Sequence, residues 1–84
     1  MNLEIIRSEI ISPLLLLAND PIPNIRFNVA KAFEVLATTF NKTNDGQAFI
    51  QQQIEPVLQQ QKNDPDADVR FFAARALLKV HPEL

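Results

Sequence analysis

Two acid–base pairs are the residues of this chain that could do chemistry: Asp20 with Arg26, and Asp64 with Arg70, each base six positions after its acid. An aspartate can move a proton, and a guanidinium beside it can hold a substrate's charge. The same two groups also form short, bidentate ion pairs that set the geometry between helices. We interpret both pairs as structural, either within one turn or between neighbouring repeats, and as important for geometry more than for stability.

No other combination of side chains favours catalysis. The chain has no Cys and a single histidine, His81, which stands beside Pro82 near the chain end, where residues are commonly solvated. Ser8 and Ser12 have no histidine nearby in the sequence, and there is no glycine-rich loop to hold a phosphate. The sequence therefore predicts a protein that is not an enzyme and that uses no cofactor or metal.

The overall composition disfavours several classes of partner. The chain has 84 residues, 46% of them apolar, which predicts one small globular domain. Its net charge of −2 lacks the basic excess of a nucleic-acid binder. No apolar run approaches the roughly 20 residues of a membrane span, and the N-terminus lacks the basic region of a secretion signal. We expect a cytoplasmic protein, with the nucleus also open to it, that binds neither nucleic acid nor membrane.

The acid–base pairs belong to an internal repeat. Residues 19–32 and 63–76 share the pattern Asn-Asp-Pro-x-x-x-(Ile/Val)-Arg-Phe-x-x-Ala-(Lys/Arg)-Ala, at an offset of 44 residues. A period of this size is typical of stacked helical pairs of the HEAT or armadillo kind. We predict an all-α fold, an α-solenoid of two stacked antiparallel helical hairpins. It forms one domain over residues 1–84, with repeat one over about residues 3–40 and repeat two over about residues 46–81.

Apolar spacing and prolines place the helices of the first repeat. A first helix over residues 3–18 carries one apolar stripe, and Pro13 within it predicts a kink over residues 9–13. Pro21 and Pro23 end that helix and start a second one, whose polar side is Asn28, Lys31 and Thr38. The predicted stripe of the first helix is Leu3, Ile6, Ile10, Leu14 and Leu17, and that of the second is Ile25, Val29, Ala32, Phe33, Leu36 and Phe40.

The second repeat reads in the same way. Residues 41–46 predict a loop, and a third helix follows that Pro56 interrupts. Glutamines over residues 51–53 and 59–61 predict a solvated helix face. Asp66 is the expected N-cap of a fourth helix, with Asp68 in its first turn. The predicted inward residues are Phe49 or Ile50, Ile54 and Val57 or Leu58 in the third helix, and Val69, Ala73, Ala76, Leu77 and Val80 in the fourth.

Several apolar residues bear on contacts between repeats. Phe27 and Phe71 are predicted to pack as wedges beside small residues, namely Ala30, Ala32, Ala74 and Ala76. Phe72 stands where the first repeat has the polar Asn28, and is either core at a terminal cap or a contact for a partner. The face of the first helix that would meet a preceding repeat is expected to be partly bare and to favour self-association; it is formed by Leu3, Ile5, Ile6 and Leu15.

The repeated segments, together with Ile54-Glu55-Pro56-Val57-Leu58 and residues 66–73, resemble the C-terminal two HEAT repeats of the scaffold (A, structural regulatory) subunit of protein phosphatase 2A. The resemblance covers about residues 10–80. It implies a non-catalytic scaffold that binds the phosphatase catalytic subunit through the turns within each repeat. Carried onto this chain, the partner-binding residues would be Asn19, Asp20, Ile22, Asn24, Asn63, Asp64, Asp66 and Asp68, with Phe72 on the adjoining helix.

Two alternatives remain open at the level of sequence. One is a HEAT-like adaptor that binds a peptide or protein on the inner face of its second and fourth helices, at Asn28, Lys31, Phe72 and Arg75. The other is a truncated fragment without independent function, because about two repeats replace the family's long array. For the same reason, binding of a variable regulatory subunit in the family's manner is not expected.

Overall fold

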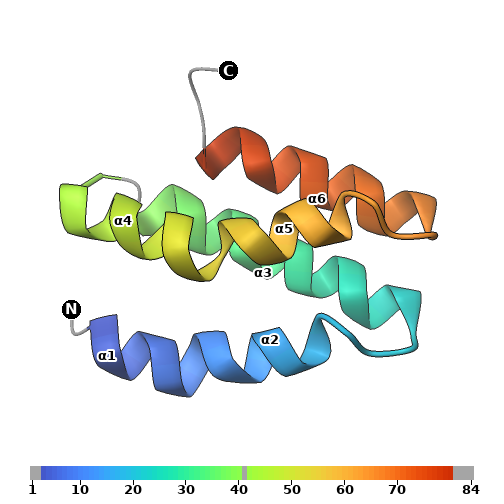
Figure 1. Cartoon of the computed structure of the whole chain (residues 1–84), viewed down its shortest axis with the longest axis horizontal. Coiled ribbons are helices and arrows are strands. Elements are labelled where there is room, and N and C mark those ends of the chain that lie inside the picture. The colour runs from blue at the N-terminus through green and yellow to red at the C-terminus, as the bar shows by residue number, and fades with distance from the viewer. Residues whose placement is uncertain (1–2, 41, 81–84) are drawn as a thin grey trace.

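The computed structural model describes residues 3–40 and 42–80, except for the side chains of residues 3 and 6. Over these residues the chain consists of helices and short turns, without a strand. The helices, labelled in Figure 1, are α1 (Leu3–Ile6), the π-helical turn η1 (Arg7–Ile11), α2 (Ser12–Leu17), α3 (Pro23–Phe40), α4 (Asn44–Gln53), α5 (Glu55–Gln61) and α6 (Ala67–Val80).

The helices form two antiparallel hairpins that lie side by side (Figure 1). In the first hairpin, α1, η1 and α2 follow one another as one long helical segment, and α3 runs back beside it. In the second, α4 and α5 form the outgoing segment and α6 the returning one. The most extensive contact between helices is that of α3 with α6, which joins the two hairpins. The predicted all-α solenoid of two stacked hairpins is confirmed.

A π-helical turn interrupts the first helical segment just before Pro13. Pro13 has no N–H to donate to the carbonyl four residues back, and its ring would clash with that carbonyl in a regular α-helix. The wider π turn is a common way to accommodate such a conflict. The hydroxyl of Ser12 donates to the carbonyl of Arg7 at 3.0 Å across this turn. The irregularity predicted over residues 9–13 is therefore present, and it takes the form of a π turn.

The π turn also shifts which residues of this segment face the core. A π turn holds one more residue than an α turn, so Ile11 is fully buried while Ile10 is 43% exposed. Leu17, also on the predicted stripe, is 42% exposed. The prediction that Ile10 and Leu17 lie on the buried stripe is wrong, although Leu14 is half-buried as expected. The side chains of Leu3 and Ile6 lie outside the described part of the chain.

The other helices bury the faces that their sequences predict. In α3, Val29 and Phe33 are buried, and the remaining members of its stripe are half-buried. The three residues assigned to its polar side are exposed. In the second hairpin the choices left open by the sequence resolve to Ile50 and Leu58 as core, with Phe49 and Val57 half-buried. Ile54 and all five inward residues predicted for α6 are buried.

The stretch predicted as a loop over residues 41–46 already contains the start of α4. Thr43 caps this helix, because its hydroxyl oxygen accepts a hydrogen bond from the N–H of Gly46 at 3.0 Å. Gly46 is buried, and a Cβ at this position would overlap the carbonyl oxygen of Phe40. The glycine serves close approach of two helix ends rather than an unusual φ angle. It therefore belongs to the packed junction between the hairpins, not to an open loop.

One prediction about helix packing holds for α3 but is wrong for two of the three residues that it named on α6, where only Ala76 is buried. Ala30 is fully buried and Phe27 half-buried, but their counterparts 44 residues later, Ala74 and Phe71, are exposed. Phe71 is 59% exposed. The local sequences match, but α3 has α6 beside it, and no described segment covers α6 on its other side. Packing of these residues is thus set by the neighbouring hairpin.

Candidate partner-binding groove

Both turns within the hairpins are shaped by the same aspartate. In the first turn, the carboxylate of Asp20 accepts a hydrogen bond from the N–H of Ile22 at 2.9 Å. In the second, the carboxylate of Asp64 accepts one from the N–H of Asp66, also at 2.9 Å. An aspartate that bonds to the backbone two residues on stabilises a turn, and the following proline prevents the helix from continuing. The repeated Asn-Asp-Pro therefore produces two copies of one corner.

The corner of each hairpin is tied to the helix that follows it by an arginine. Arg26 donates through Nη1 to the carbonyl oxygen of Asp20 at 2.8 Å. Arg70 donates through Nη1 to the carbonyl oxygens of Asp64 and Pro65, at 2.7 and 2.9 Å. The spacing of six residues between acid and base thus reflects a guanidinium that closes its own turn by binding backbone, not the carboxylate of the same repeat.

Arg26 also joins the two corners to each other. It donates from Nε and Nη2 to the two carboxylate oxygens of Asp64, at 2.9 and 3.1 Å. Only 14% of the Arg26 side chain and 11% of the Asp64 side chain are exposed. Of the two pairings that the sequence left open, the structure therefore selects the one between neighbouring repeats. This bidentate, nearly buried pair fixes the position of one turn relative to the next.

The ionised state of Asp64 is stabilised by this arrangement. Burial raises the pKa of the carboxyl group, but the hydrogen bonds from Arg26 and from the N–H of Asp66, with the charges of Arg26 and Arg70, outweigh that effect. The net result is a pKa below the ordinary value for an aspartate. Asp64 is therefore a permanently charged structural anchor at neutral pH rather than a group poised to exchange a proton.

A polar groove of about 370 Å³ lies between the two corners. Four of the predicted site residues line it together, namely Asn19 and Asp20 from the first turn and Asn63 and Asp64 from the second. The other turn residues lie outside its lining: Ile22, Asn24 and Asp68 are exposed, and Asp66 is half-buried. The carboxylate of Asp66 accepts from the N–H groups of Asp68 and Val69 at 2.9 and 3.1 Å, which confirms its predicted role as N-cap of α6.

Phe72, the ninth predicted residue, lies away from this groove, on the seam between α3 and α6. Its ring stacks on Phe27 with a centroid distance of 5.3 Å and meets Phe71 edge-on at 5.2 Å. The ammonium of Lys31 lies 5.4 Å from the centre of the Phe72 ring. The ring is half-buried. Of the two interpretations that the sequence left open, these contacts favour packing between the repeats.

Gln61 is one of the groove residues that the sequence did not predict as part of a binding surface. It was expected on a solvated face with the neighbouring glutamines, but it is 4% exposed. Its Nε2 donates to the carbonyl oxygen of Arg26 at 3.1 Å, so it reaches from α5 to the start of α3. Its Oε1 is buried without a hydrogen-bond partner among the described residues. The sequence around Gln61 does not distinguish it from Gln59 and Gln60. Gln61 is buried only because the first hairpin covers it, and no local pattern shows that contact.

The groove is suited to hydrogen bonding with another molecule rather than to chemistry. Its carboxylates are engaged with arginine and backbone groups, and no nucleophile stands beside a base within it. In the part of the chain that the structure describes, no cluster of three or more His, Cys, Asp or Glu side chains could hold a metal ion. His81 lies outside that part. None of the described helices is long and apolar enough to cross a membrane.

Comparison with known proteins finds sequence similarity to much longer proteins. The family model of the HEAT repeat matches residues 10–40, which include the first corner. The chain is 36% identical over 78 residues to the A-type regulatory subunit of protein phosphatase PP2A from Saccharomyces cerevisiae, and that match covers 92% of this chain. It is 67% identical over 36 residues, 43% of the chain, to the identically named protein of Schizosaccharomyces pombe.

A Drosophila melanogaster relative, the serine/threonine-protein phosphatase PP2A 65 kDa regulatory subunit, is 38% identical over 61 residues, which is 73% of this chain. The three matches span 12%, 6% and 10% of the relatives' own lengths. No solved structure matches the chain. Two of the three matches thus cover most of this molecule, and all three cover a small part of the relative.

Proposed function

Because the chain is a HEAT-repeat solenoid that resembles the A-type regulatory subunits of protein phosphatase PP2A over most of its length, we propose that it is a non-catalytic scaffold module that binds a phosphatase catalytic subunit. The binding surface is the pair of corners at residues 19–24 and 63–68. In keeping with this role, we propose that the protein acts in the cytoplasm, where such a phosphatase would be met, and also in the nucleus.

One observation supports the corners above other surfaces. The Arg26–Asp64 pair holds the two turns in fixed register, so that exposed polar groups of both, Asn19 and Asn63, face a partner as one preformed surface. Pre-organisation lowers the entropy lost on binding. The anchoring residues themselves are mostly buried and contribute geometry, while the exposed side chains around them make the contacts.

The test must therefore spare Asp64, since a charge reversal there would break the fold as well as the surface. We suggest replacing the exposed groove residues together, Asn19→Lys with Asn63→Lys. The matched control is Gln51→Lys with Gln52→Lys, which adds the same charge on the exposed side of α4. Binding of a purified phosphatase catalytic subunit is measured by calorimetry. The groove variant should bind at least about tenfold more weakly than wild type, and the control should bind normally. Equal binding by all three proteins, or no binding by wild type, would reject the proposal.

A second candidate surface lies on the inner face of α3 and α6. There Lys31, Phe72 and Arg75 line a shallow pocket of about 200 Å³ together with Glu34 and Val35. Arg75 is paired with Glu34 at 3.1 Å, and Lys31 lies over Phe72, so the cations already have internal partners. Asn28 is not part of that pocket. A peptide adaptor would lose binding on Lys31→Glu and keep it in the groove variant, whereas the scaffold proposed here would do the reverse.

A further inference from the structure

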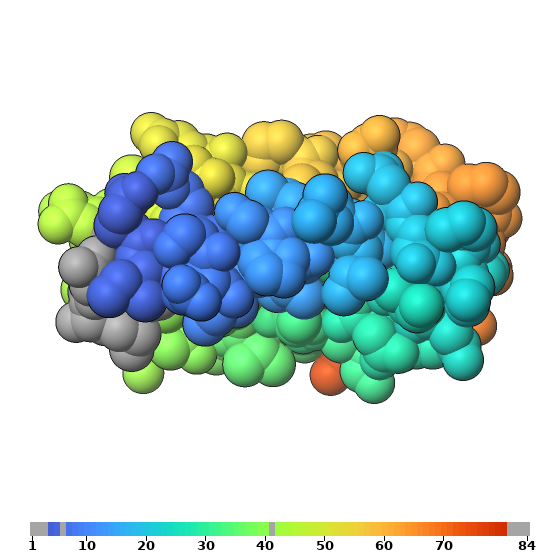
Figure 2. Space-filling view, turned by 90° about the horizontal axis from the view of Figure 1, so that it is seen from below, coloured from blue at the N-terminus to red at the C-terminus, as the bar shows by residue number. Residues whose placement is uncertain are grey.

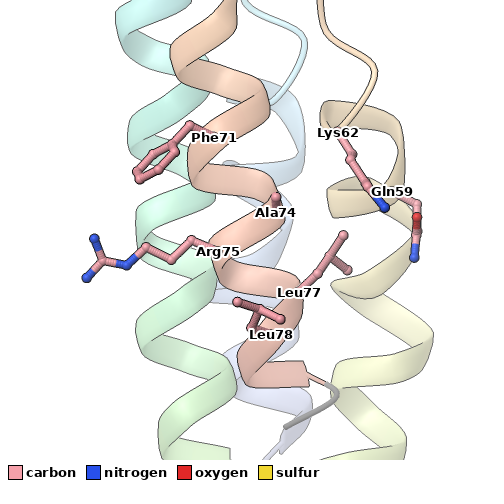
Figure 3. Close-up of a pocket in the computed structure, with 7 residues that line it drawn as sticks. All are labelled: Gln59, Lys62, Phe71, Ala74, Arg75, Leu77 and Leu78. Carbon is pink, nitrogen blue, oxygen red and sulfur yellow. The ribbon is translucent and has the colours of Figure 1, made fainter. Parts of the chain in front are cut away.

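The outer side of the second hairpin carries an apolar groove of about 530 Å³ between α5 and α6 (Figure 3). Gln59 of α5 and Lys62, the residue directly after α5, line one wall, and α6 contributes apolar side chains, among them Phe71 and Leu78. Phe71 is 59% and Leu78 57% exposed. No described residue shields these two large apolar side chains from water. Such an exposed apolar surface is suited to contact with another protein.

The internal repeat indicates what geometry fits this groove. Phe71 and Ala74 are the counterparts, 44 residues on, of Phe27 and Ala30. In the first hairpin these positions face the second one: Phe27 stacks on Phe72, and Ala30 is fully buried. The groove is therefore the site where a further hairpin would lie on α6 as α6 lies on α3.

The two ends of the molecule carry opposite charges that could pair as Arg26 and Asp64 do within the chain. Within the chain, the arginine of the first corner pairs with the aspartate of the second. Their counterparts, Asp20 and Arg70, form no ion pair with any described residue: Asp20 accepts from a backbone N–H, and Arg70 donates to two backbone carbonyls. One end of the stack thus offers a carboxylate, and the other a guanidinium, each at the place where the internal pair would be repeated.

The opposite end of the molecule is apolar as well. Figure 1 places α1 and α2 on the side away from α6, and Figure 2 shows them across the face seen from below, between α3 and the α4–α5 segment. On this segment Leu16 is 80% and Ile5 58% exposed. The exposed Ile5 agrees with the bare N-terminal face predicted from the sequence, whereas Leu15 is half-buried. Both ends therefore combine an apolar surface with one charge of the repeated pair.

We propose that a second copy of this chain stacks the face formed by its α1–α2 segment and α3 on the α5–α6 groove of the first copy. In this contact α3 of one copy lies on α6 of the other, and Asp20 of one pairs with Arg70 of the other. The contact joins two different faces, so it leaves a free end on each side and extends into open chains as concentration rises.

The contact between copies is weaker than the α3–α6 seam within one chain. Asn28 takes the place of Phe72, which stacks on Phe27 in that seam, and Leu78 takes the place of Glu34, which pairs with Arg75 there. This contact does not depend on the proposed phosphatase role: the α5–α6 groove shares no lining residue with the groove between the corners, and of the residues named here only Asp20 belongs to both surfaces.

Two charge reversals test the contact by sedimentation velocity at rising protein concentration. Asp20→Arg alone and Arg70→Asp alone each place like charges across the contact, and each should raise the concentration needed for assembly by about tenfold or more. The two variants mixed, or both changes in one chain, restore an opposite-charge pair and should restore assembly. Asp45→Arg, which makes the same charge change as Asp20→Arg on exposed α4, should assemble like wild type.

Three results would contradict the proposed contact. A wild type that stays monomeric at every concentration, single variants that assemble like wild type, or a mixture that fails to recover would each overturn the proposal. Far-UV circular dichroism reports whether each variant is folded. If Arg70→Asp proves unfolded because its turn loses two hydrogen bonds, Leu78→Lys tests the same groove without touching that turn. It should also raise the concentration needed for assembly by about tenfold or more.

Discussion

At the scale of single residues, the pair of Arg26 and Asp64 determines more of this structure than any other. Both side chains are nearly buried, and together they connect backbone and side-chain groups of two turns and two helices. Burying a charge is costly, and the cost is offset only while its partner is present. The pair therefore contributes chiefly by excluding other ways of stacking the hairpins, since any slip would strand both charges.

A double-mutant cycle measures this dependence. Arg26→Met and Asp64→Asn should each lower the free energy of unfolding by about 3 kcal/mol or more, because each leaves a buried polar group without its partner. The double variant should lose less than the sum, giving a coupling energy of about 1–3 kcal/mol. Urea unfolding provides the measurement. As a reference, Glu34→Gln with Arg75→Gln should show coupling below about 1 kcal/mol, because the Arg75 side chain is 57% exposed. Equal coupling in both cycles would contradict this account.

The lowered pKa of Asp64 predicts how the protein responds to acid. Because the folded-state pKa lies below the unfolded-state value, the charged carboxylate stabilises the fold above the unfolded-state pKa, about 3.9. That contribution is lost as the pH falls through the folded-state value. The stability difference between wild type and Asp64→Asn should therefore be full at neutral pH and shrink below about pH 4. A difference in urea midpoint that stays constant down to the acid limit would show that Asp64 does not carry this effect.

At the scale of helices, prolines and small residues set where each segment starts and how it meets the next. Pro13 and Pro56 interrupt the first segment of each hairpin, yet the two interruptions differ. The first is a π turn, and the second is a break at Ile54 between α4 and α5. Pro56 stands at the start of α5, where its missing N–H costs nothing. The same local signal thus produces two local structures, and only the first shifts the buried face.

Gly46 offers the sharpest test of the junction between the hairpins. A Cβ at this position would overlap the carbonyl oxygen of Phe40, so Gly46→Ala must push α4 away from the end of α3. We expect a loss of about 1–3 kcal/mol in the free energy of unfolding, as for other overpacked sites. Gln52→Ala, at an exposed position of the same helix, should change it by less than about 0.5 kcal/mol. Helix propensity alone would make the Gly46→Ala variant more stable than wild type. That result would show that α4 does not closely approach the end of α3.

At the scale of the whole molecule, one core serves both hairpins. The buried cluster includes Ile11 and Phe33 from the first hairpin and Ile54 and Leu77 from the second. In repeat proteins such an interface supplies much of the stability, since one unit cannot bury its apolar face alone. The molecule also has direction, because its two ends differ.

The shared core predicts that neither half folds alone. Chains of residues 1–42 and 43–84 should each show low helicity and no cooperative thermal transition, because fully buried residues such as Ala30 and Ala73 would lose their cover. The intact chain should unfold in a single transition. Circular dichroism during heating compares the three proteins, and mixing the two halves should recover part of the lost helicity. A sharp transition in either isolated half would contradict the single-core description.

The sequence by itself determined the elements: four helical segments, the Asp66 cap of the last one, the two corners and the 44-residue repeat. These follow from signals between near neighbours, such as apolar spacing, proline and the aspartate in each turn. The tertiary structure alone decided that Arg26 binds the next repeat's Asp64, that Gln61 is buried while Gln59 is not, and that Phe27 is covered while Phe71 is exposed. In each of these cases the local sequences are alike, and what differs is the surface lying across the seam, which no local pattern encodes.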